Sequence, residues 1–465
     1  MYSELERRRI ADALAAAFLD GGRWRAEDLA ERGAGVLDPR PEWIDALAFA
    51  TAALTRATPS FGDRRRVEEF IETWLAKRPE VPGRDAPAPL VIAQLEPDLT
   101  RRGAVRSPVI ARGWPIAHVD AVMELAERLE LDLGQLAWLA DVRGLERTTP
   151  HERLRNYRYR WIPRRSGLPR LIEAPKLRLK EIQRWILREI LSQVPAHDAA
   201  HGFTRGRSAI THATLHCGQR AVLSLDVRDF FPSVAASRVY GIFCTLGYPR
   251  AVAHVLTGLC TNVAPTMAWN ALPPGGESDG TRFRLGRALA TPHLPQGAPT
   301  SPALANLAAF GLDRRLTGLA GAFGLRYSRY ADDLTLSGRA LSGKRSTAVA
   351  AYAAKIAREE GFALQPRKSR LRTAARRQLV TGVVVNAHPN LARSEYDRLR
   401  ATLHRLALDG PPADDGAVDL RAQLRGRVAW AESLNPARGA KLRRLYEAIE
   451  WDPRSSPGPH AAGPA

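Results

Sequence analysis

The chain has 465 residues, enough for two or three domains, and its 45% hydrophobic and 25% charged residues are typical of a globular protein rather than a disordered one. Its 69 lysines and arginines exceed its 49 aspartates and glutamates, giving a net charge of +20 and an isoelectric point near 10.6. That charge predicts a polyanionic partner, either a nucleic acid or an acidic membrane surface. No uncharged apolar run approaches the roughly 18 residues of a membrane span, so a spanning protein is not expected.

The cysteines predict a reducing compartment. Cys217, Cys244 and Cys260 are odd in number and lack the spacing of a metal site. The first residues contain no apolar stretch like that of a signal peptide. We therefore expect a cytoplasmic protein.

The first third of the chain has helical periodicity and no catalytic pattern. Residues 1 to about 90 and 115–141 carry apolar side chains at helical spacing, and the proline-rich interval 78–97 is typical of a linker. We predict a helical accessory region over residues 1–145.

From Arg153 the composition changes. Residues 153–161 interleave arginines with aromatic residues, which suits phosphates and stacked bases, although a basic amphipathic strand would look the same. Residues 163–172 predict two strands joined by a turn, and 176–191 predict a helix. The loop 201–208 carries two glycines between basic residues, so its backbone could approach a phosphate closely.

An acidic residue follows a short apolar run. Ala221 to Leu225 predict a buried strand that ends at Asp226, a position suited to a metal ligand or to an ordinary helix cap. Residues 262–292, punctuated by glycine and proline, predict an inserted surface loop. The proline-rich segment 294–302 predicts a rigid loop that opens a helix over 303–319.

Two adjacent aspartates, Asp332 and Asp333, interrupt a period-two alternation that runs from Leu325 to Gly338. This pattern predicts a β-hairpin with two carboxylates at its tip. Neighbouring carboxylates repel each other unless a cation binds, and Mg²⁺ with its preference for oxygen ligands is the natural one. A solvated turn is the alternative for this short segment alone.

The remaining segments are a predicted helix at 346–360, a strand at 379–385, helices over 394–451 and a disordered tail at 452–465. Arginines line the last helices. Solvated faces explain many of them, and an RNA-facing surface would explain a cluster.

Three of these motifs resemble, in order and spacing, those of reverse transcriptases. They are Asp226-x-x-Asp229-Phe230-Phe231-Pro232, Leu294-Pro295-Gln296-Gly297-x-Pro299-x-Ser301-Pro302 and Tyr330-Ala331-Asp332-Asp333. Within that family the chain is most similar to the bacterial retron enzymes, on motifs that include His201-Gly202-Phe203-x-x-Gly206-Arg207-Ser208, Val380-Thr381-Gly382 and Gly426-x-x-x-Trp430. One position departs, because His212 stands where these enzymes carry an asparagine.

The resemblance implies an α/β right-hand polymerase, with an antiparallel palm sheet, fingers, a helical thumb and a helical N-terminal extension. We expect fingers and palm at 146–385, the thumb at 386–451 and the extension at 1–145.

The resemblance also implies roles for single residues. Asp226, Asp332 and Asp333 would be catalytic and, with the Val227 carbonyl, would bind two Mg²⁺ ions. The expected nucleotide-binding residues are Arg164, Arg165, Arg170, Phe231, Gln296, Gly297 and Lys368, with Phe231 excluding a 2′-hydroxyl. The expected RNA-binding residues are Val380, Thr381, Gly382, Arg421, Arg425 and Arg427.

By the same resemblance, the activity would be RNA-directed DNA synthesis from deoxynucleoside triphosphates. A structured non-coding RNA would be both template and primer, and synthesis from its 2′-hydroxyl would leave a branched RNA–DNA product. The resemblance also implies antiviral defence, with an effector protein as a further candidate partner. A membrane partner is not expected, because no apolar run is long enough to span one. The alternatives are another bacterial class, such as a group II intron enzyme, or a catalytically idle RNA-binding scaffold.

Overall fold

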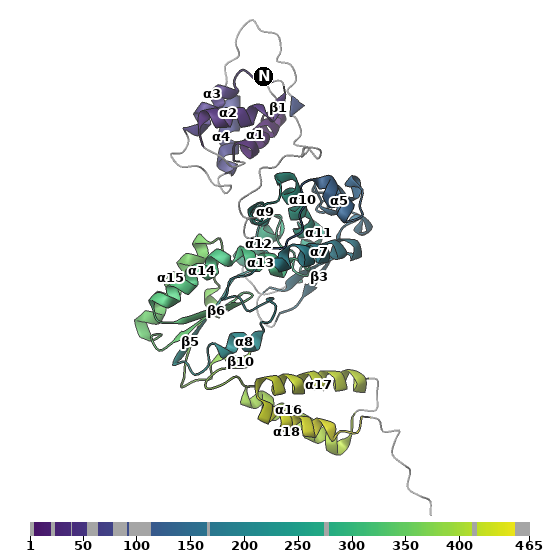
Figure 1. The fold of residues 1–465 in the computed structure, drawn as a ribbon, viewed down its shortest axis with the longest axis vertical. Helices are drawn as coiled ribbons and strands as arrows, with labels where there is room; N and C mark the ends of the chain where they lie inside the picture. The colour runs from purple at the N-terminus through teal and green to yellow at the C-terminus, as the bar shows by residue number, and fades with distance from the viewer. Residues whose placement is uncertain are drawn as a thin grey trace, which may run out of the picture. The chain divides into compact units, whose positions relative to one another are not determined.

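The computed structural model describes most of the chain, which forms two compact units (Figure 1). The described residues are 4–19, 24–38, 40–53, 64–77, 91–92, 113–164, 168–273, 279–411 and 416–451. The first unit comprises Met1–Val105, Val119–Arg128 and Pro249–Val252, and the second comprises Arg106–His118, Leu129–Tyr248 and Ala253–Ala465. The predicted disordered tail at 452–465 lies outside the described residues.

Short helices around an apolar core make up the first unit. Its elements are α1 (Glu4–Leu19), α2 (Ala26–Ala34), β1 (Leu37–Asp38), α3 (Ile44–Ala52), α4 (Arg64–Ala76), β2 (Val91–Ile92) and α5 (Val122–Arg128). Apolar residues at helical spacing meet in this core, among them the buried Leu14, Phe18, Ile44 and Leu47. Gly33 lets α2 approach α3, because a Cβ atom there would lie 2.8 Å from Cδ1 of Ile44. Of the interval predicted as a linker, only β2 is described, and it pairs antiparallel with β1.

The second unit contains a two-stranded hairpin followed by a helix. Its first elements are α6 (Leu133–Leu139), η3 (Glu152–Leu154), β3 (Tyr157–Ile162), β4 (Arg170–Pro175), α7 (Leu177–Glu189), η4 (Leu191–Gln193) and α8 (Ala209–Thr214). β3 and β4 pair antiparallel, from Tyr157 opposite Pro175 to Ile162 opposite Arg170. The prediction of two strands within 163–172 is right for the second strand only, because the first strand is β3, which ends at Ile162 before that segment begins. Residues 165–167 lie outside the described residues.

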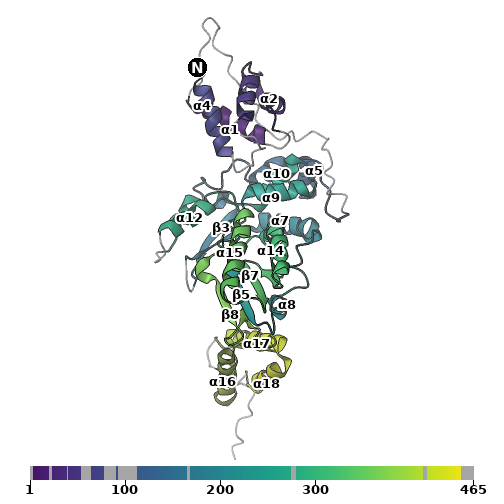
Figure 2. The same ribbon diagram turned by 90° about the vertical axis from the view of Figure 1, so that its left-hand side faces the viewer.

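A four-stranded antiparallel sheet lies at the centre of the second unit (Figure 2). Its strands are β5 (Ala221–Asp226), β6 (Arg326–Tyr330), β7 (Asp333–Gly338) and β8 (Arg370–Thr373), in the order β6–β7–β5–β8. The alternation of β7 predicts one polar face, yet every residue from Leu334 to Gly338 is buried. The reason is that polar side chains on this sheet have buried partners: Ser328 and Ser337 both bond to the ring of His216, at 2.7 Å each.

Further helices lie between β5 and β6 and after β7 in the chain. They are α9 (Ala236–Thr245), α10 (Arg250–Cys260), α11 (Thr266–Asn270), α12 (Asp279–Leu289), α13 (Ser301–Ala308), α14 (Phe310–Ala322) and α15 (Gly343–Glu359), with the 3₁₀ turn η5 (Pro366–Lys368). The prediction of a surface loop at 262–292 is wrong, because α11 and α12 occupy much of it. Apolar burial explains the difference, since Leu285 and Leu289 of α12 join a small core with Leu168 of the hairpin, and Trp269 packs against it.

The C-terminal part begins with a short hairpin and continues as three helices. The elements are β9 (Leu379–Val380), β10 (Val383–Val384), α16 (Arg393–Asp409), α17 (Gly416–Leu434) and α18 (Pro436–Glu447). The single strand predicted at 379–385 is a hairpin, because Thr381 and Gly382 both have positive φ, +46° and +82°, as a two-residue type I′ turn requires. Leucines recur at helical spacing along these helices, and Leu403, Leu424 and Leu442 are buried in one core. In the described part of the chain, no helix is both long and apolar enough to cross a membrane.

Candidate active site

Acidic residues meet where β5 ends and β7 begins. Asp226 is the last residue of β5 and Asp333 the first of β7, and the two are opposite each other in the antiparallel pairing. The backbone N–H of Val227 donates to the carbonyl of Asp332 at 2.8 Å, which fixes the turn against the end of β5. Ala331 in that turn has a φ of +54°, rare for a residue other than glycine. The sheet therefore holds the acidic hairpin tip that the sequence predicts.

The electrostatics of this corner are unfavourable without a cation. Burial, followed by repulsion from Asp332 and Asp226, raises the pKa of Asp333 to about 7. Burial also raises the pKa of Asp226, although the ammonium of Lys368 opposes the shift. Lys368 Nζ lies 2.9 Å from Asp226 Oδ2 and 3.1 Å from Oδ1. One lysine therefore offsets part of the charge of three neighbouring carboxylates.

These oxygen ligands suit a hard divalent cation, which would relieve the repulsion that raises the pKa of Asp333. Among the described residues, no three His, Cys, Asp or Glu side chains stand close enough together to hold an ion as they are. Lys368 supplies the positive charge in this arrangement. A divalent ion would compete with it for Asp226.

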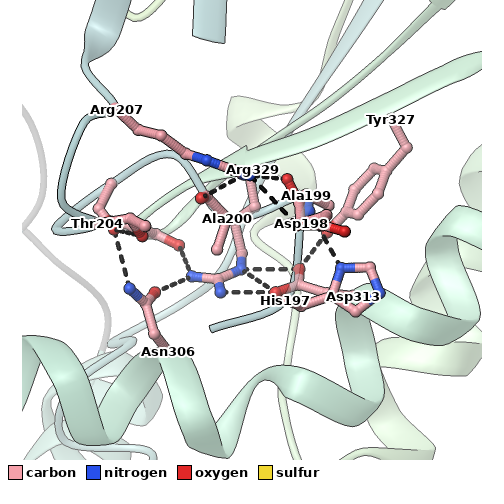
Figure 3. A network of polar contacts seen from close by, with 12 residues as sticks. His197, Asp198, Ala199, Ala200, Thr204, Arg207, Asn306, Asp313, Tyr327 and Arg329 are labelled. Carbon is pink, nitrogen blue, oxygen red and sulfur yellow. Dashed lines mark hydrogen bonds and ion pairs between the residues drawn. The ribbon is translucent and has the colours of Figure 1, made fainter. Parts of the chain in front are cut away.

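A buried arginine bonds to the backbone of the acidic turn. The side chain of Arg329 is fully buried, and its Nε and Nη2 donate to the Asp313 carboxylate at 2.9 and 2.7 Å (Figure 3). Its Nη1 donates to Oδ1 of Asn306 at 3.0 Å and to the carbonyl of Ala331 at 3.1 Å. The hydroxyl of Tyr327 donates to Asp313 at 2.8 Å. The network thus fixes the backbone of the residue that precedes Asp332.

The β3–β4 hairpin brings a basic residue to the same corner. Burial and the charge of Arg170 lower the pKa of Arg164, against the opposing effect of Asp229, Asp332 and Asp226. Arg164 therefore lies within electrostatic range of the acidic residues, where a triphosphate would also be attracted.

The loop after α12 is fixed against β4. With its amide oxygen turned toward Arg170, Gln296 accepts from Nε and Nη1 at 3.1 and 3.2 Å. Its backbone carbonyl accepts from the N–H of Glu173 at 2.9 Å. Gly297 has a φ of +134°, and a Cβ atom there would lie 2.9 Å from the Glu173 carbonyl, so only glycine fits. The structure thus brings Arg170, Gln296 and Gly297 together, whereas Arg165 lies outside the described residues.

The chain turns sharply between β5 and α9. Asp229 has a φ of +46°, and burial raises the pKa of its carboxyl group. Phe230 is buried, while Phe231 is half-buried with its ring centroid 5.6 Å from that of Phe230. Part of the Phe231 ring therefore remains accessible.

Residues 162–385 match the family described as reverse transcriptase (RNA-dependent DNA polymerase). The chain is 42% identical over 302 residues to the retron Mx65 reverse transcriptase of Myxococcus xanthus, a match covering 63% of this chain and 65% of that protein. It is 34% identical over 368 residues to the retron Mx162 reverse transcriptase of the same organism, covering 76% and 71%. It is 32% identical over 300 residues to the retron Ec86 reverse transcriptase of Escherichia coli, covering 63% and 80%.

The chain belongs to the retron reverse transcriptases. These enzymes are RNA-directed DNA polymerases, and the resemblance inferred from the sequence motifs is confirmed at the level of the family. The match spans 65% of the length of the Mx65 protein. The family fold is that of a polymerase with fingers, palm and thumb, and the mixture of helices and antiparallel sheet agrees with it.

Three histidines pack together behind the acidic turn of this reverse transcriptase. The ring of His212 lies 5.7 Å from that of His201 and 5.6 Å from that of His216, and 5.9 Å from that of Tyr330. Burial lowers the pKa of His201 to about 4 and, with the neighbouring histidines, those of His212 and His216 to about 3. The three rings are therefore neutral near pH 7.

Thr381 lies next to His212, the residue that stands where the retron enzymes carry an asparagine. Thr381 Oγ1 lies 3.4 Å from Nδ1 of His212 and donates to the Ala209 carbonyl at 3.5 Å. The turn of Val380, Thr381 and Gly382 is thereby packed on α8.

The arginines predicted to bind RNA lie on α17, not at the acidic corner. Arg421 and Arg425 are exposed, and Arg427 is half-buried. The guanidinium of Arg421 lies 5.8 Å from the centre of the Trp451 ring. The helix packs against α18, so these side chains belong to a different surface from the carboxylates.

Sequence reasoning missed the residues that support the site. Arg329, Asp313 and Asn306 carry no motif that marks them. One signal was present. Arg329 continues the every-second-residue series of Leu325 and Tyr327, so the alternation places its charge on the apolar face of the strand. A buried charge requires a partner, so this position alone predicts an acidic or polar partner for Arg329.

Proposed function

We propose that this chain copies a structured non-coding RNA into DNA, starting from a 2′-hydroxyl of that RNA and leaving a branched product. The observation that carries the proposal is the corner formed by Asp226, Asp332 and Asp333, with Lys368 and Arg164 beside it. Few other functions need three mutually repelling carboxylates at one end of a sheet's central strands, next to cationic side chains. The retron family supplies the type of RNA and the branched linkage.

In this proposal the parts of a right-hand polymerase correspond to segments of the chain. Residues 146–385 are fingers and palm, with the four-stranded sheet as the palm, and residues 386–451 are the thumb. Residues 1–145 are a helical accessory region. Support comes from the antiparallel order β6–β7–β5–β8, which puts β5 and β7 side by side so that their acidic ends meet.

The three aspartates, with the carbonyl of Val227, would hold two Mg²⁺ ions. When bound, such ions would neutralise charge that develops during phosphoryl transfer. The part of the protein is to fix the ligands. β5 and β7 set two of the carboxylates opposite each other, and Arg329 holds the turn between β6 and β7. Lys368, released from Asp226, would contact the pyrophosphate.

The incoming deoxynucleoside triphosphate lies against the hairpin β3–β4. Arg164, Arg165 and Arg170 attract its phosphates, and the Gln296–Gly297 loop packs beside the new base pair. The hydrogen bonds between Arg170 and Gln296 support this assignment because they fix the loop and the hairpin as one wall. Phe231 underlies the sugar and excludes a 2′-hydroxyl.

The RNA is recognised away from the chemistry. Val380, Thr381 and Gly382, together with Arg421, Arg425 and Arg427, form the RNA-reading surface. Exposed arginines suit phosphates and unpaired bases, and a positive-φ turn brings backbone close to a ligand. From the family, we infer that the biological setting is a cytoplasmic antiviral system that includes an effector protein.

The test uses the RNA transcribed from the DNA beside the gene. Purified chain, this RNA, Mg²⁺ and labelled deoxynucleotides should yield DNA that stays attached to RNA after denaturation. Treatment with an enzyme that cleaves 2′,5′-linkages should release it, and the same RNA with a 2′-deoxy branch residue should give no product. Synthesis that occurs only on an added primer, or a product unaffected by that enzyme, would contradict self-priming.

A further inference from the structure

An exposed aromatic ring, that of Phe203, lies beside the acidic turn. Phe203 is in the loop that follows η4, and 52% of its surface is exposed. Its backbone has a φ of +60°, a conformation that bulky residues rarely adopt. Single exposed apolar residues are common on proteins. A strained one held beside catalytic carboxylates is not, and strained conformations cluster at functional sites.

The loop that carries Phe203 is fixed directly against the catalytic turn. A Cβ atom at Gly202 would lie 2.6 Å from the backbone N of Ala331, so the two backbones touch. Nδ2 of Asn306 donates to the Gly202 carbonyl at 2.9 Å, and Thr204 Oγ1 donates to the same atom at 3.3 Å. Asn306 also accepts from Arg329, the residue that holds Ala331 (Figure 3). One buried network thus positions both the carboxylate turn and the loop of Phe203.

Both sides of this loop are also anchored. Upstream, the N–H of His201 donates to the Arg329 carbonyl and the N–H of Arg329 donates to the Ala199 carbonyl, each at 2.7 Å. Downstream, Nη1 of Arg207 donates to the Ala200 carbonyl at 3.1 Å and also bonds to Asp198. The loop is therefore rigid, and the accessible ring of Phe203 is presented in a fixed place.

The ring neighbours of Phe203 indicate what it contacts. Its centroid lies 6.1 Å from that of Phe231 and 6.4 Å from that of Tyr330. Phe231 is the residue assigned to the incoming sugar, and Tyr330 leads into the carboxylates. Phosphoryl transfer needs the attacking hydroxyl and the leaving group in line on opposite sides of the phosphate. The proposed function sets the triphosphate against Arg164 and Arg170, which leaves the ring that adjoins Tyr330 to the primer end.

We propose that the exposed ring of Phe203 binds the primer end of the template–primer duplex by contact with its sugars and base edges, and so positions the attacking 3′ end. This inference rests on the proposed polymerase function. An aromatic surface is tolerant of base sequence, as a processive copying enzyme requires. Phe203 would then act together with Phe231, one ring for the growing strand and one for the incoming nucleotide.

The experiment measures two quantities separately in full-length protein. One is the Kd of a labelled RNA template with an annealed DNA primer, and the other is the KM for deoxynucleotides at saturating duplex. Phe203→Ala and Phe203→Gly should both raise the duplex Kd about tenfold, within the range for loss of one stacking aromatic, and change KM less than about twofold. Phe203→Trp should retain the affinity. The Gly variant separates ring from backbone, because glycine adopts a φ of +60° without strain and keeps the loop folded.

Tyr352→Ala is the matched control. Tyr352 on α15 is also 52% exposed and also has an aromatic neighbour, but that neighbour is Phe323 at the end of α14 rather than a residue of the acidic turn. Its replacement should leave both quantities unchanged. If the Phe203 variants keep their duplex affinity, the inference is wrong, and a raised KM alone would assign the ring to the incoming nucleotide instead. A wild-type protein that binds duplex but synthesises no DNA would contradict the polymerase proposal, which is a different outcome.

Discussion

Strand β6 and helix α17 both carry arginines, and the two elements use them differently. Arg329 of β6 is fully buried, paired with Asp313 and bonded to the acidic turn. Arg421 and Arg425 of α17 are exposed. Arg329 is therefore a structural part of the site, whereas Arg421 and Arg425 remain accessible to an anionic ligand. A net charge of +20 does not distinguish these uses, so charge alone predicts a nucleic-acid partner but not where it binds.

The largest expected effect separates the chemistry of the sheet from binding by the helices. Replacing Asp332 and Asp333 by Asn together should reduce primer extension by about a thousandfold or more, since it removes the negative charge that would hold the metal ions. RNA affinity should be retained, because the binding surface assigned to α17 is intact. Extension rates and RNA binding are measured on the same preparation, and near-normal extension would show that the chemistry is elsewhere.

Arg329 and Arg421 give a direct comparison of buried and exposed arginine. Arg329→Met leaves Asp313 buried without its positively charged partner and should lower the free energy of unfolding by about 3–5 kcal/mol. Arg421→Met should change it by no more than about 0.5 kcal/mol. Denaturant unfolding monitors both.

Arg329→Lys sharpens this result. A lysine keeps the charge but cannot reproduce the forked geometry that reaches Asp313, Asn306 and Ala331 at once. We expect intermediate stability with reduced extension. Equal stability of the Met variants at positions 329 and 421 would refute the distinction between the two regions.

The histidine cluster should make the sheet more sensitive to acid than the C-terminal helices. Burial holds the pKa of His216 at about 3 in the folded protein, whereas in the unfolded chain it is about 6.5. As pH falls below about 6.5 the unfolded state binds protons that the folded state excludes, so stability falls by about 1.4 kcal/mol per pH unit for each such histidine. Arg326 and Arg329 face this cluster, and together with the repulsion among its own histidines they oppose protonation further.

Hydrogen exchange measures this effect region by region. Protection of β6 and β7 should decrease between pH 7 and pH 5 more than protection of α17. His216→Gln should reduce that dependence on pH, and His404→Gln on the exposed face of α16 is the control. Equal loss of protection in both regions would contradict the prediction.

The smallest expected effects concern α17. Replacing Arg421, Arg425 and Arg427 by Gln should reduce the slope of log affinity against log salt by about 0.7–0.9 for each phosphate that the variant no longer neutralises. Affinity for the RNA encoded beside the gene should fall more than affinity for an unrelated RNA of equal length, and extension of an annealed primer should survive better than self-primed synthesis. Equal decreases on both RNAs would make α17 a general phosphate-binding surface.

The same contrast explains what the sequence could predict. Local patterns predicted the hairpin with Asp332 and Asp333 and the strand that ends at Asp226, because alternation and apolar runs involve only neighbouring residues. The family followed from the order of short motifs along the chain. The helices at 262–292 did not, since burial of Leu285 and Leu289 against Leu168 depends on residues distant in sequence. The support of the turn by Asn306, Asp313 and Arg329 was likewise invisible, because it is created only when β6 packs on α14 and α13.

The most direct test locates the metal ions. Crystals of the chain with an RNA template, a primer lacking its 3′-hydroxyl and a deoxynucleoside triphosphate would be soaked in Mn²⁺, and its anomalous signal mapped. We expect two peaks about 3.5–4 Å apart, bounded by carboxylate oxygens of Asp226, Asp332 and Asp333, with Lys368 Nζ no longer bonded to Asp226. Peaks elsewhere, with Lys368 still paired to Asp226, would contradict the assignment of this corner as the catalytic centre.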